Sequence, residues 1–399
     1  MAFLTSDNTM NFYSTLDLSV FALPKNSLFD RFTSSFQICT IFIAVKLDSI
    51  CYCMNKKKYT IKDIAQFAGV SKGTVDRVLH KRGRVSKDAY QKVDRVLKKI
   101  DYRPNPIARN LKINKTYKIC VLIPDFEIDP YWLPAIEGVR IAAKEFGPFG
   151  VVVEEYPYHP NKTVHFVEQS NVAIESNPDA LLMVPIFHKE SLKVFQNCRQ
   201  KGIFLASFNN HIDSLSIENF IGQDLVQSGR VAANLIDKVT AEGTHIAIIH
   251  IDEELHMRQK EIGFRDYFKE KKRNTKKIIT YNLKTDNPDN FKTGFTLFLE
   301  SHPWITGFFV TNSKAHLLIE FLRTDGRNFT MVGYDLLEEN LKHLRKGKID
   351  FLIHQKPKRQ AYLGIGYLAE YFLFEKEMPS QELLPIDIVT AENVKYYIN

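Results

Sequence analysis

Polar, charged and aromatic side chains recur where apolar runs of this chain end. Carboxylate, amide and guanidinium groups form paired hydrogen bonds with hydroxyls, and aromatic rings cover the C–H faces of small rings. Together these residue types favour a polyhydroxylated ligand such as a sugar. The candidates are Asp129, Tyr131, Trp132, His188, Asn209, Asn210, Arg258, Asn312, Asp335 and Gln355.

Alternating apolar runs and helical patterns from residue 117 onward must position these side chains. The runs that read as strands are KICVLIPD, VVVEEY, DALLMVPI, IFLASF, NFIGQD, HIAIIHI, KIITYNL, ITGFFVT, FTMVGYD and DFLIHQ. Between them, residues 133–146, 163–176, 189–201, 226–240 and 291–301 read as helices. This alternation predicts two parallel sheets covered by helices on both faces. Ligands bind beyond the carboxyl ends of such strands, so the candidates are expected to meet in one cleft.

Each candidate also has a structural alternative. Asp335 could cap a helix that starts at the next residue. Asn312 and Gln355 could satisfy backbone groups where the chain crosses between sheets. Of Tyr131 and Trp132, one is expected to be buried away from the ligand.

A different pattern, of three short amphipathic helices, occupies residues 59–100. Thr60 can cap a helix at 61–67 that Gly69 ends, Ser71 can cap a second helix at 72–80, and Ser86 a third. The second helix leaves a basic outer face, which suits a DNA major groove. The positions expected to face inward are Ile61, Ile64, Ala65, Ala68, Val75, Val78, Leu79, Val93, Val96, Leu97 and Ile100.

The positive charge of the chain is concentrated in this same region. The formal net charge is +8, but residues 54–116 alone hold 18 Lys and Arg against 5 Asp and Glu. A basic segment in an otherwise acidic chain indicates a polyanionic partner for that segment.

The segments AxxAGVSxxTVxRVL, VS and YxPNxxAxxL within residues 65–111 resemble the DNA-binding headpiece of the lactose-repressor (LacI) family. The resemblance implies a sequence-specific regulator with a hinge segment that orders on DNA and presses a leucine into the minor groove. Asp76 departs from the serine usual in the family, which leaves the operator sequence open. By resemblance, Lys72 and Arg77 read bases, Thr60, Ser71, Thr74, Lys81 and Arg84 hold phosphates, and Gly73, Asn105, Ala108 and Leu111 complete the DNA-binding set.

The remainder of the chain resembles the periplasmic sugar-binding-protein body that this family carries behind its headpiece. The resemblance implies three crossings between two lobes, near Gln223, His354 and Gln381. His188 lies where pentose binders often place an acidic side chain, so a structural histidine is an equal alternative there. Arg258 in RxxxxGF, Asn312, Asp335 and Gln355 match positions that contact sugar hydroxyls in pentose-binding relatives, and Tyr131 and Trp132 match their stacking aromatics.

Four segments are expected along the chain. Residues 1–53 are interpreted as a disordered or misassigned-start extension, 54–103 as the helix-turn-helix domain, 104–116 as hinge helix and linker, and 117–399 as the effector-binding domain. Within that domain, lobe 1 is expected at about 117–222 and 354–381, and lobe 2 at about 223–353 and 382–399.

Catalytic and metal chemistry find little support in the sequence. The Cys51 and Cys53 pair has no second set of thiols or histidines at zinc-ligand spacing, and five cysteines in this length favour a reducing compartment. Glu154 and Glu155 occupy adjacent strand positions, so they point to opposite faces and cannot act as a convergent acid and base. We therefore expect neither an enzyme nor a cofactor.

The combined interpretation is a cytoplasmic, homodimeric transcription regulator that binds double-stranded operator DNA and no membrane. A small saccharide bound between the lobes is expected to change its operator affinity. The alternatives are a sugar-binding transport component, a sugar-modifying enzyme, or a regulator that senses a nucleobase or a phosphorylated sugar.

Overall fold

The computed structural model describes residues 59–79, 82–100, 102, 115–212, 219–272, 277–324 and 328–398. The chain divides into two compact units, residues 1–104 and 105–399. The expectations for residues 1–53, the Cys51 and Cys53 pair, Lys81, and the hinge residues Asn105, Ala108 and Leu111 fall outside the described residues.

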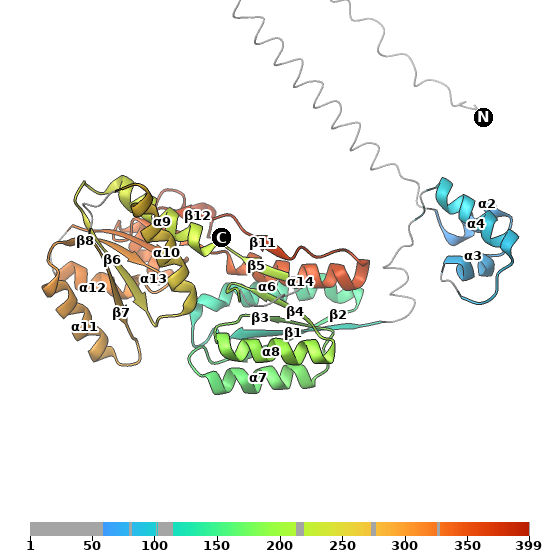
Figure 1. The fold of residues 1–399 in the computed structure, drawn as a ribbon, viewed down its shortest axis with the longest axis horizontal. Coiled ribbons are helices and arrows are strands. Elements are labelled where there is room, and N and C mark those ends of the chain that lie inside the picture. The colour runs from blue at the N-terminus through green and yellow to red at the C-terminus, as the bar shows by residue number, and fades with distance from the viewer. Residues whose placement is uncertain are drawn as a thin grey trace, which may run out of the picture. The chain divides into compact units, whose positions relative to one another are not determined.

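The described residues of the first unit form three helices, α2 (Ile61–Ala68), α3 (Lys72–Leu79) and α4 (Lys87–Lys99) (Figure 1). Thr60 and Asp63 form a reciprocal capping box at the start of α2, and Gly69 ends that helix with a φ of 62°. The Ser86 hydroxyl caps α4 by accepting the Ala89 N–H. A small core joins the three helices, formed by Ile64, Ala65, Ala68, Val75, Val78 and Val93.

The first lobe of the second unit is a parallel six-stranded sheet in the order β11-β5-β4-β3-β1-β2. Helices α6 (Leu133–Phe146) and α14 (Pro357–Phe374) cover one face, while α7 (Thr163–Glu175) and α8 (His188–Lys201) cover the other (Figure 1). The strands are β1 (Tyr117–Pro124), β2 (Val151–Tyr158), β3 (Ala180–Met183), β4 (Phe204–Phe208), β5 (Asn219–Gly222) and β11 (Gln381–Leu383).

The second lobe is a six-stranded sheet in the order β12-β10-β9-β8-β6-β7, parallel except at β12. Helices α9 (Leu225–Val239) and α10 (Leu255–Glu270) cover one face, and α11 (Pro288–Ser301), α12 (His316–Thr324) and α13 (Glu338–Arg345) the other. The strands are β6 (His245–Ile251), β7 (Ile278–Leu283), β8 (Ile305–Val310), β9 (Thr330–Tyr334), β10 (Phe351–His354) and β12 (Asp387–Val389).

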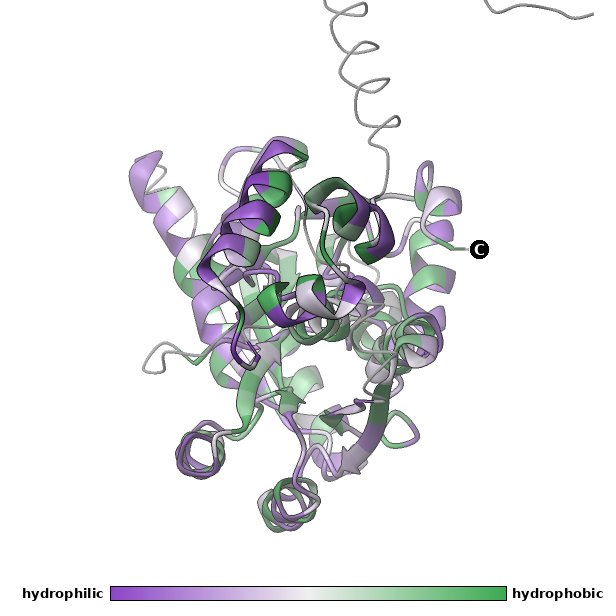
Figure 2. Cartoon of the chain, turned by 90° about the vertical axis from the view of Figure 1, so that its right-hand side faces the viewer, coloured by the Kyte–Doolittle hydropathy of each residue, from purple (hydrophilic) through white to green (hydrophobic). Residues whose placement is uncertain are grey.

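Both sheets are covered on each face, so their inner strands are largely apolar on both sides. In Figure 2 the helices carry both hydrophilic and hydrophobic colouring, whereas much of the strand ribbon is hydrophobic. This confirms the α/β body with two mostly parallel sheets and flanking helices. Among the described residues, no helix is long and apolar enough to cross a membrane.

Three chain crossings join the two lobes, and Gln223 ties them together. The first crossing follows β5 at Gln223, and its amide Nε2 donates to the carbonyl oxygens of His354 (3.1 Å) and Pro385 (2.9 Å) on the other two. The third crossing follows β11, which still pairs with β5, so it lies after Leu383 rather than near residue 381. The sequence places this crossing only approximately, because β11 is too short and too polar to show as an apolar run.

Candidate functional site

A cavity of about 490 Å³ lies between the lobes, where the carboxyl ends of their strands face each other. Residues that follow β1, β2 and β4 form its first wall, and residues that follow β6, β7, β8 and β9 form the second. This is the position expected for a ligand site in parallel α/β sheets. The sequence candidates that line it are Asp129, Tyr131, Trp132, Asn209, Asn210, Asn312, Asp335 and Gln355.

The aromatic pair follows β1 in a short 3-10 helix, η2 (Pro130–Trp132), which the Asp129 carboxylate caps by accepting the Tyr131 N–H at 3.1 Å. The two rings meet edge to face at 4.7 Å, and both line the cavity. Both side chains are also buried in the core of the first lobe, so the expectation that one ring lies away from the ligand stays a prediction. The Tyr131 hydroxyl accepts a hydrogen bond from Asn209 Nδ2 at 2.5 Å. Burial, followed by the nearby Asp335 charge, holds the pKa of Tyr131 well above its usual value, so the phenol stays protonated.

Asp335 lies directly after β9 in a left-handed backbone conformation, with a φ of 62°. Its carboxylate accepts the Gln355 backbone N–H at 3.0 Å and the Gln355 side-chain Nε2 at 2.6 Å. Helix α13 begins at Glu338, with Leu337 in the capping position, so Asp335 does not cap it. Asn209 and Asp252 also line the cavity with positive φ, and such backbone conformations concentrate at functional sites.

Asn312 serves the backbone and also lines the cavity. Its Nδ2 donates to the Ile251 carbonyl at 2.7 Å, and its Oδ1 accepts the Lys314 N–H at 3.2 Å. The structural alternative therefore holds for Asn312. These bonds fix the direction of its side chain at the end of β8.

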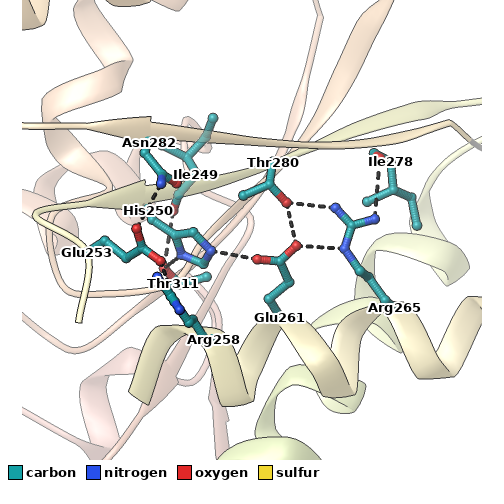
Figure 3. A network of polar contacts seen from close by, with 10 residues as sticks. All are labelled: Ile249, His250, Glu253, Arg258, Glu261, Arg265, Ile278, Thr280, Asn282 and Thr311. Atoms are coloured by element: carbon teal, nitrogen blue, oxygen red, sulfur yellow. Dashed lines mark hydrogen bonds and ion pairs between the residues drawn. The ribbon is translucent and has the colours of Figure 1, made fainter. Parts of the chain in front are cut away.

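His188 and Arg258 do not line this cavity. They line a neighbouring hollow of about 390 Å³, which shares Asn210, Glu254 and His256 with the main cavity. Arg258 is 65% exposed, and its Nε donates to Glu253 Oε1 at 2.6 Å (Figure 3). The expectation that both residues lie in the main cavity was wrong, because both occupy first turns of helices beyond their strand ends, where the sequence does not give the side-chain direction.

Several charged lining residues were missed by the sequence reasoning. Asp252 directly follows β6 and pairs with the Lys314 ammonium, and it also accepts the Thr285 N–H at 2.8 Å. A search that covered the six residues after each strand end would have found the missed set. Its members are Asp252, Glu254, His256, Lys314, His316 and Glu339.

A polar network crosses the second lobe behind the cavity (Figure 3). His250 contacts the Thr311 hydroxyl at 2.8 Å through Nδ1 and Glu261 Oε2 at 2.8 Å through Nε2. Hydroxyl, imidazole and carboxylate lie in the order found in hydrolases. However, Thr311 is fully buried and its hydroxyl donates to the Ile249 carbonyl, so no substrate can reach it. The network therefore holds α10 against its sheet.

Lys260 is a fully buried lysine beneath the cavity floor that the sequence reasoning also missed. Its Nζ donates to the Thr311 carbonyl at 2.9 Å and lies 3.7 Å from the centre of the Tyr334 ring. Thr311 and Tyr334 directly precede the lining residues Asn312 and Asp335. Burial lowers the pKa of Lys260 to about 8, against an opposing effect of the Asp335 and Glu254 charges.

Lys260→Met is expected to change how stability depends on pH. Between pH about 8 and 10.5 the unfolded chain keeps the Lys260 proton that the folded chain releases, so the free energy of unfolding rises with pH. Across that range the wild type should gain roughly 3 kcal/mol relative to the variant. Urea unfolding of both proteins at several pH values measures this gain. A constant difference between them would mean that the pKa of Lys260 is ordinary.

The DNA-facing candidates of the first unit lie on or beside α3. Lys72, Gly73 and Arg77 are exposed on this helix, and Arg84 is exposed ahead of α4. Ser71 accepts the Thr74 N–H at 3.1 Å, so its hydroxyl caps α3. The Thr60 hydroxyl is likewise engaged, as a donor to Asp63 at 2.7 Å. The lysine and arginine side chains are therefore the accessible groups for a polyanion.

Comparison with known proteins divides the chain in the same way. Residues 60–105 match the model of bacterial regulatory proteins of the lacI family, and residues 119–376 match a periplasmic binding protein domain. The chain is similar to the ribose operon repressor of Lactococcus lactis subsp. lactis (strain IL1403), with 40% identity over 88 residues, which are 22% of this chain and 27% of that repressor. It is also similar to the ribose operon repressor of Escherichia coli (strain K12), with 28% identity over 172 residues, 42% of this chain and 50% of that repressor.

A solved structure supports the body fold. A Bacteroides fragilis protein assigned as a LacI transcriptional regulator superposes with a TM-score of 0.67 at 28% identity, covering 71% of this chain and all of that one. The matches to the two curated repressors extend over only 27% and 50% of their own lengths.

Proposed function

Because the chain belongs to the periplasmic binding protein domain family and carries a lacI-family DNA-binding domain ahead of that body, we propose that it is a transcription regulator whose affinity for operator DNA is set by a small sugar. The observation that carries the proposal is the presence of two sites in one chain. One is an exposed basic recognition helix, and the other is a cavity with walls from both lobes. A DNA-binding regulator of this kind works in the cytoplasm.

The cavity supplies complementary groups for a polyhydroxylated ring from both lobes. The first lobe contributes the aromatic faces of Tyr131 and Trp132 and the amide of Asn209. The second contributes the Asp335 carboxylate, and Gln355 at the second crossing bonds that carboxylate. Carboxylates and amides accept and donate to sugar hydroxyls, and the rings cover C–H faces. Two of the similar proteins are named as ribose operon repressors, which is consistent with a sugar effector.

A ligand that bonds to both walls stabilises one arrangement of the lobes over others. The three crossings tied by Gln223 allow rotation of the lobes as rigid bodies. If the protein acts as a homodimer, a change in lobe arrangement alters the spacing of two headpieces on a near-palindromic operator. Ligand and DNA affinities are then coupled reciprocally. The hinge residues Asn105, Ala108 and Leu111 would transmit this change in the minor groove.

The proposal is tested by titration of operator DNA, selected from a random pool, against the full chain at fixed salt. Each titration is repeated with a panel of pentoses, hexoses and their phosphates. We expect tight DNA binding that one class of sugar shifts several-fold. If the chain binds no DNA from the pool, the regulator proposal fails and the body remains a solute-binding component. If it binds DNA tightly but no compound changes that affinity, the cavity has no effector role.

Arg77→Ala is expected to weaken operator binding and relax specificity at one base pair in each half-site. Arg77 is exposed in the last turn of α3, where a guanidinium can form two hydrogen bonds with guanine. The loss should be roughly 1 to 3 kcal/mol. Binding to a library of single-base operator variants measures it. The matched control is Lys92→Ala, on α4, where the lysine already pairs with Asp88. A uniform loss over all sequences would make Arg77 a phosphate contact.

A further inference from the structure

The cavity between the lobes is strongly acidic, which narrows the class of ligand that it accepts. Among the described lining residues, Lys314 is the single lysine or arginine, and its ammonium is already bound to Asp252. The Asp335 charge raises the pKa of the buried Lys260 ammonium against the effect of burial, so the two groups attract each other. Imidazoles of His256 and His316 also line the cavity. The lining carboxylates are Asp129, Asp252, Glu254, Asp335 and Glu339.

Asp129 and Glu254 line the cavity from opposite lobes, and neither forms an ion pair with a described lysine or arginine. Asp129 follows β1, accepts the Tyr131 N–H at 3.1 Å, and forms no ion pair with a described residue. Glu254 precedes α10, and its Oε2 lies 3.2 Å from His256 Nδ1. Burial raises the pKa of Asp129, the Tyr131 N–H and the Lys314 charge oppose that rise, and the Glu254 charge adds to it. These two carboxylates therefore repel each other across the space that a ligand occupies.

The side-chain amide of Asn210 is a second, independent feature that indicates a ligand in this cavity. It is 8% exposed and lines the cavity beside Asn209. Its side-chain amide forms no hydrogen bond with any described residue. Buried amides are normally paired, so this group is available for a bound molecule. It also lines the neighbouring hollow, together with Glu254.

We propose that the effector is an amine-bearing polyol, such as an amino sugar, with its protonated amine held between Asp129 and Glu254. This inference rests on the proposed function and specifies the ligand of the same cavity. The ammonium donates to both carboxylates, which removes their repulsion and draws the two lobes together. The rings of Tyr131 and Trp132 and the Asn210 amide hold the polyol. A phosphorylated sugar is disfavoured, because its dianion would meet the same carboxylates with no free arginine or lysine among the described lining residues.

The test is calorimetric titration of the full chain at a slightly acidic pH at which the amine is protonated. The probes are glucose, galactose and mannose, each compared with its 2-amino-2-deoxy, 2-acetamido and 6-phosphate forms. At least one amine should bind roughly tenfold or more tightly than its parent and its acetamide, because hydrogen bonds to charged groups are stronger than neutral ones. The phosphates should bind more weakly than their parents.

Two variants test whether the preference for the amine depends on Asp129 and Glu254. Asp129→Asn and Glu254→Gln should each reduce the preference for the amine over its parent sugar several-fold. The matched control is Glu253→Gln, which removes a carboxylate one residue away that binds Arg258 and Asn282 and does not line the cavity. This control should keep the preference. Two cavity variants are used so that a folding defect in one does not decide the outcome.

Three outcomes overturn the inference. They are a parent sugar that binds as well as its amine, an amine preference that survives both cavity variants, and a panel in which no compound binds. In the first two cases the regulator stands and only its ligand class changes. In the third, operator binding by the same preparations decides separately whether the proposed function stands.

Discussion

Asp335→Asn is expected to abolish the effect of the sugar on operator binding and to leave the affinity for operator DNA unchanged. Asp335 is 3% exposed at the end of β9 and lines the cavity. Its carboxylate orients Gln355 through two hydrogen bonds, so the substitution changes the charge and also the direction of a second lining amide. The combined loss should reduce sugar affinity by about a hundredfold.

Asparagine is the appropriate replacement because the backbone at this position is left-handed. Asn tolerates a φ of 62°, whereas Ala at the same position would add strain and confuse loss of binding with loss of folding. The matched control is Asp350→Asn. The Asp350 carboxylate accepts the Met331 N–H at the opposite end of the same sheet and does not line the cavity. Sugar response should survive in that variant. If Asp335→Asn keeps the response as well, the sugar response depends neither on the Asp335 charge nor on the Gln355 orientation that the carboxylate fixes.

The strands and most helices of the body were predictable from the sequence. Each of the ten apolar runs overlaps one of the strands β1 to β10, because strands covered on both faces are largely apolar. The two remaining strands, β11 and β12, each have three residues and were not predicted. Backbone pairing with β5 and β10 holds them in place, and hydropathy carries no signal for such pairing.

The site was predictable where a strand end fixes the direction of a side chain, and also at Asp129, Tyr131 and Trp132, which line the cavity from beyond the end of β1. Asn312 is the second residue after β8, and Asp335 is the first residue after β9. Both line the cavity. Arg258 lies seven residues after β6 and inside α10, whose rotation about its axis depends on packing against α9. The same packing buries Lys260 two residues away, although a lysine in a helix usually faces solvent.

Gly263→Ala is expected to destabilise the second lobe by about 3 kcal/mol, because a small residue is required where α10 crosses α9. A Cβ at Gly263 would lie 1.8 Å from the Val226 carbonyl oxygen, and one at Gly229 would lie 1.8 Å from the Lys260 carbonyl oxygen. Both obstacles are backbone atoms, so no side-chain movement can relieve the overlap. Helix α10 must move away, and with it Glu254 and Lys260 at the cavity. Sugar affinity should therefore fall together with stability.

Gly366→Ala is the matched control for this prediction. Gly366 lies inside α14, and its added Cβ would meet the Phe146 ring at an ordinary distance of 3.8 Å. Because alanine favours the helix over glycine by up to about 1 kcal/mol, this variant should be neutral or more stable. Urea unfolding followed by circular dichroism measures both variants, and sugar titration follows the cavity. Equal stability of the two variants would show that α9 and α10 can separate at little cost in free energy. The position of Glu254 at the start of α10 would then depend on the bound ligand.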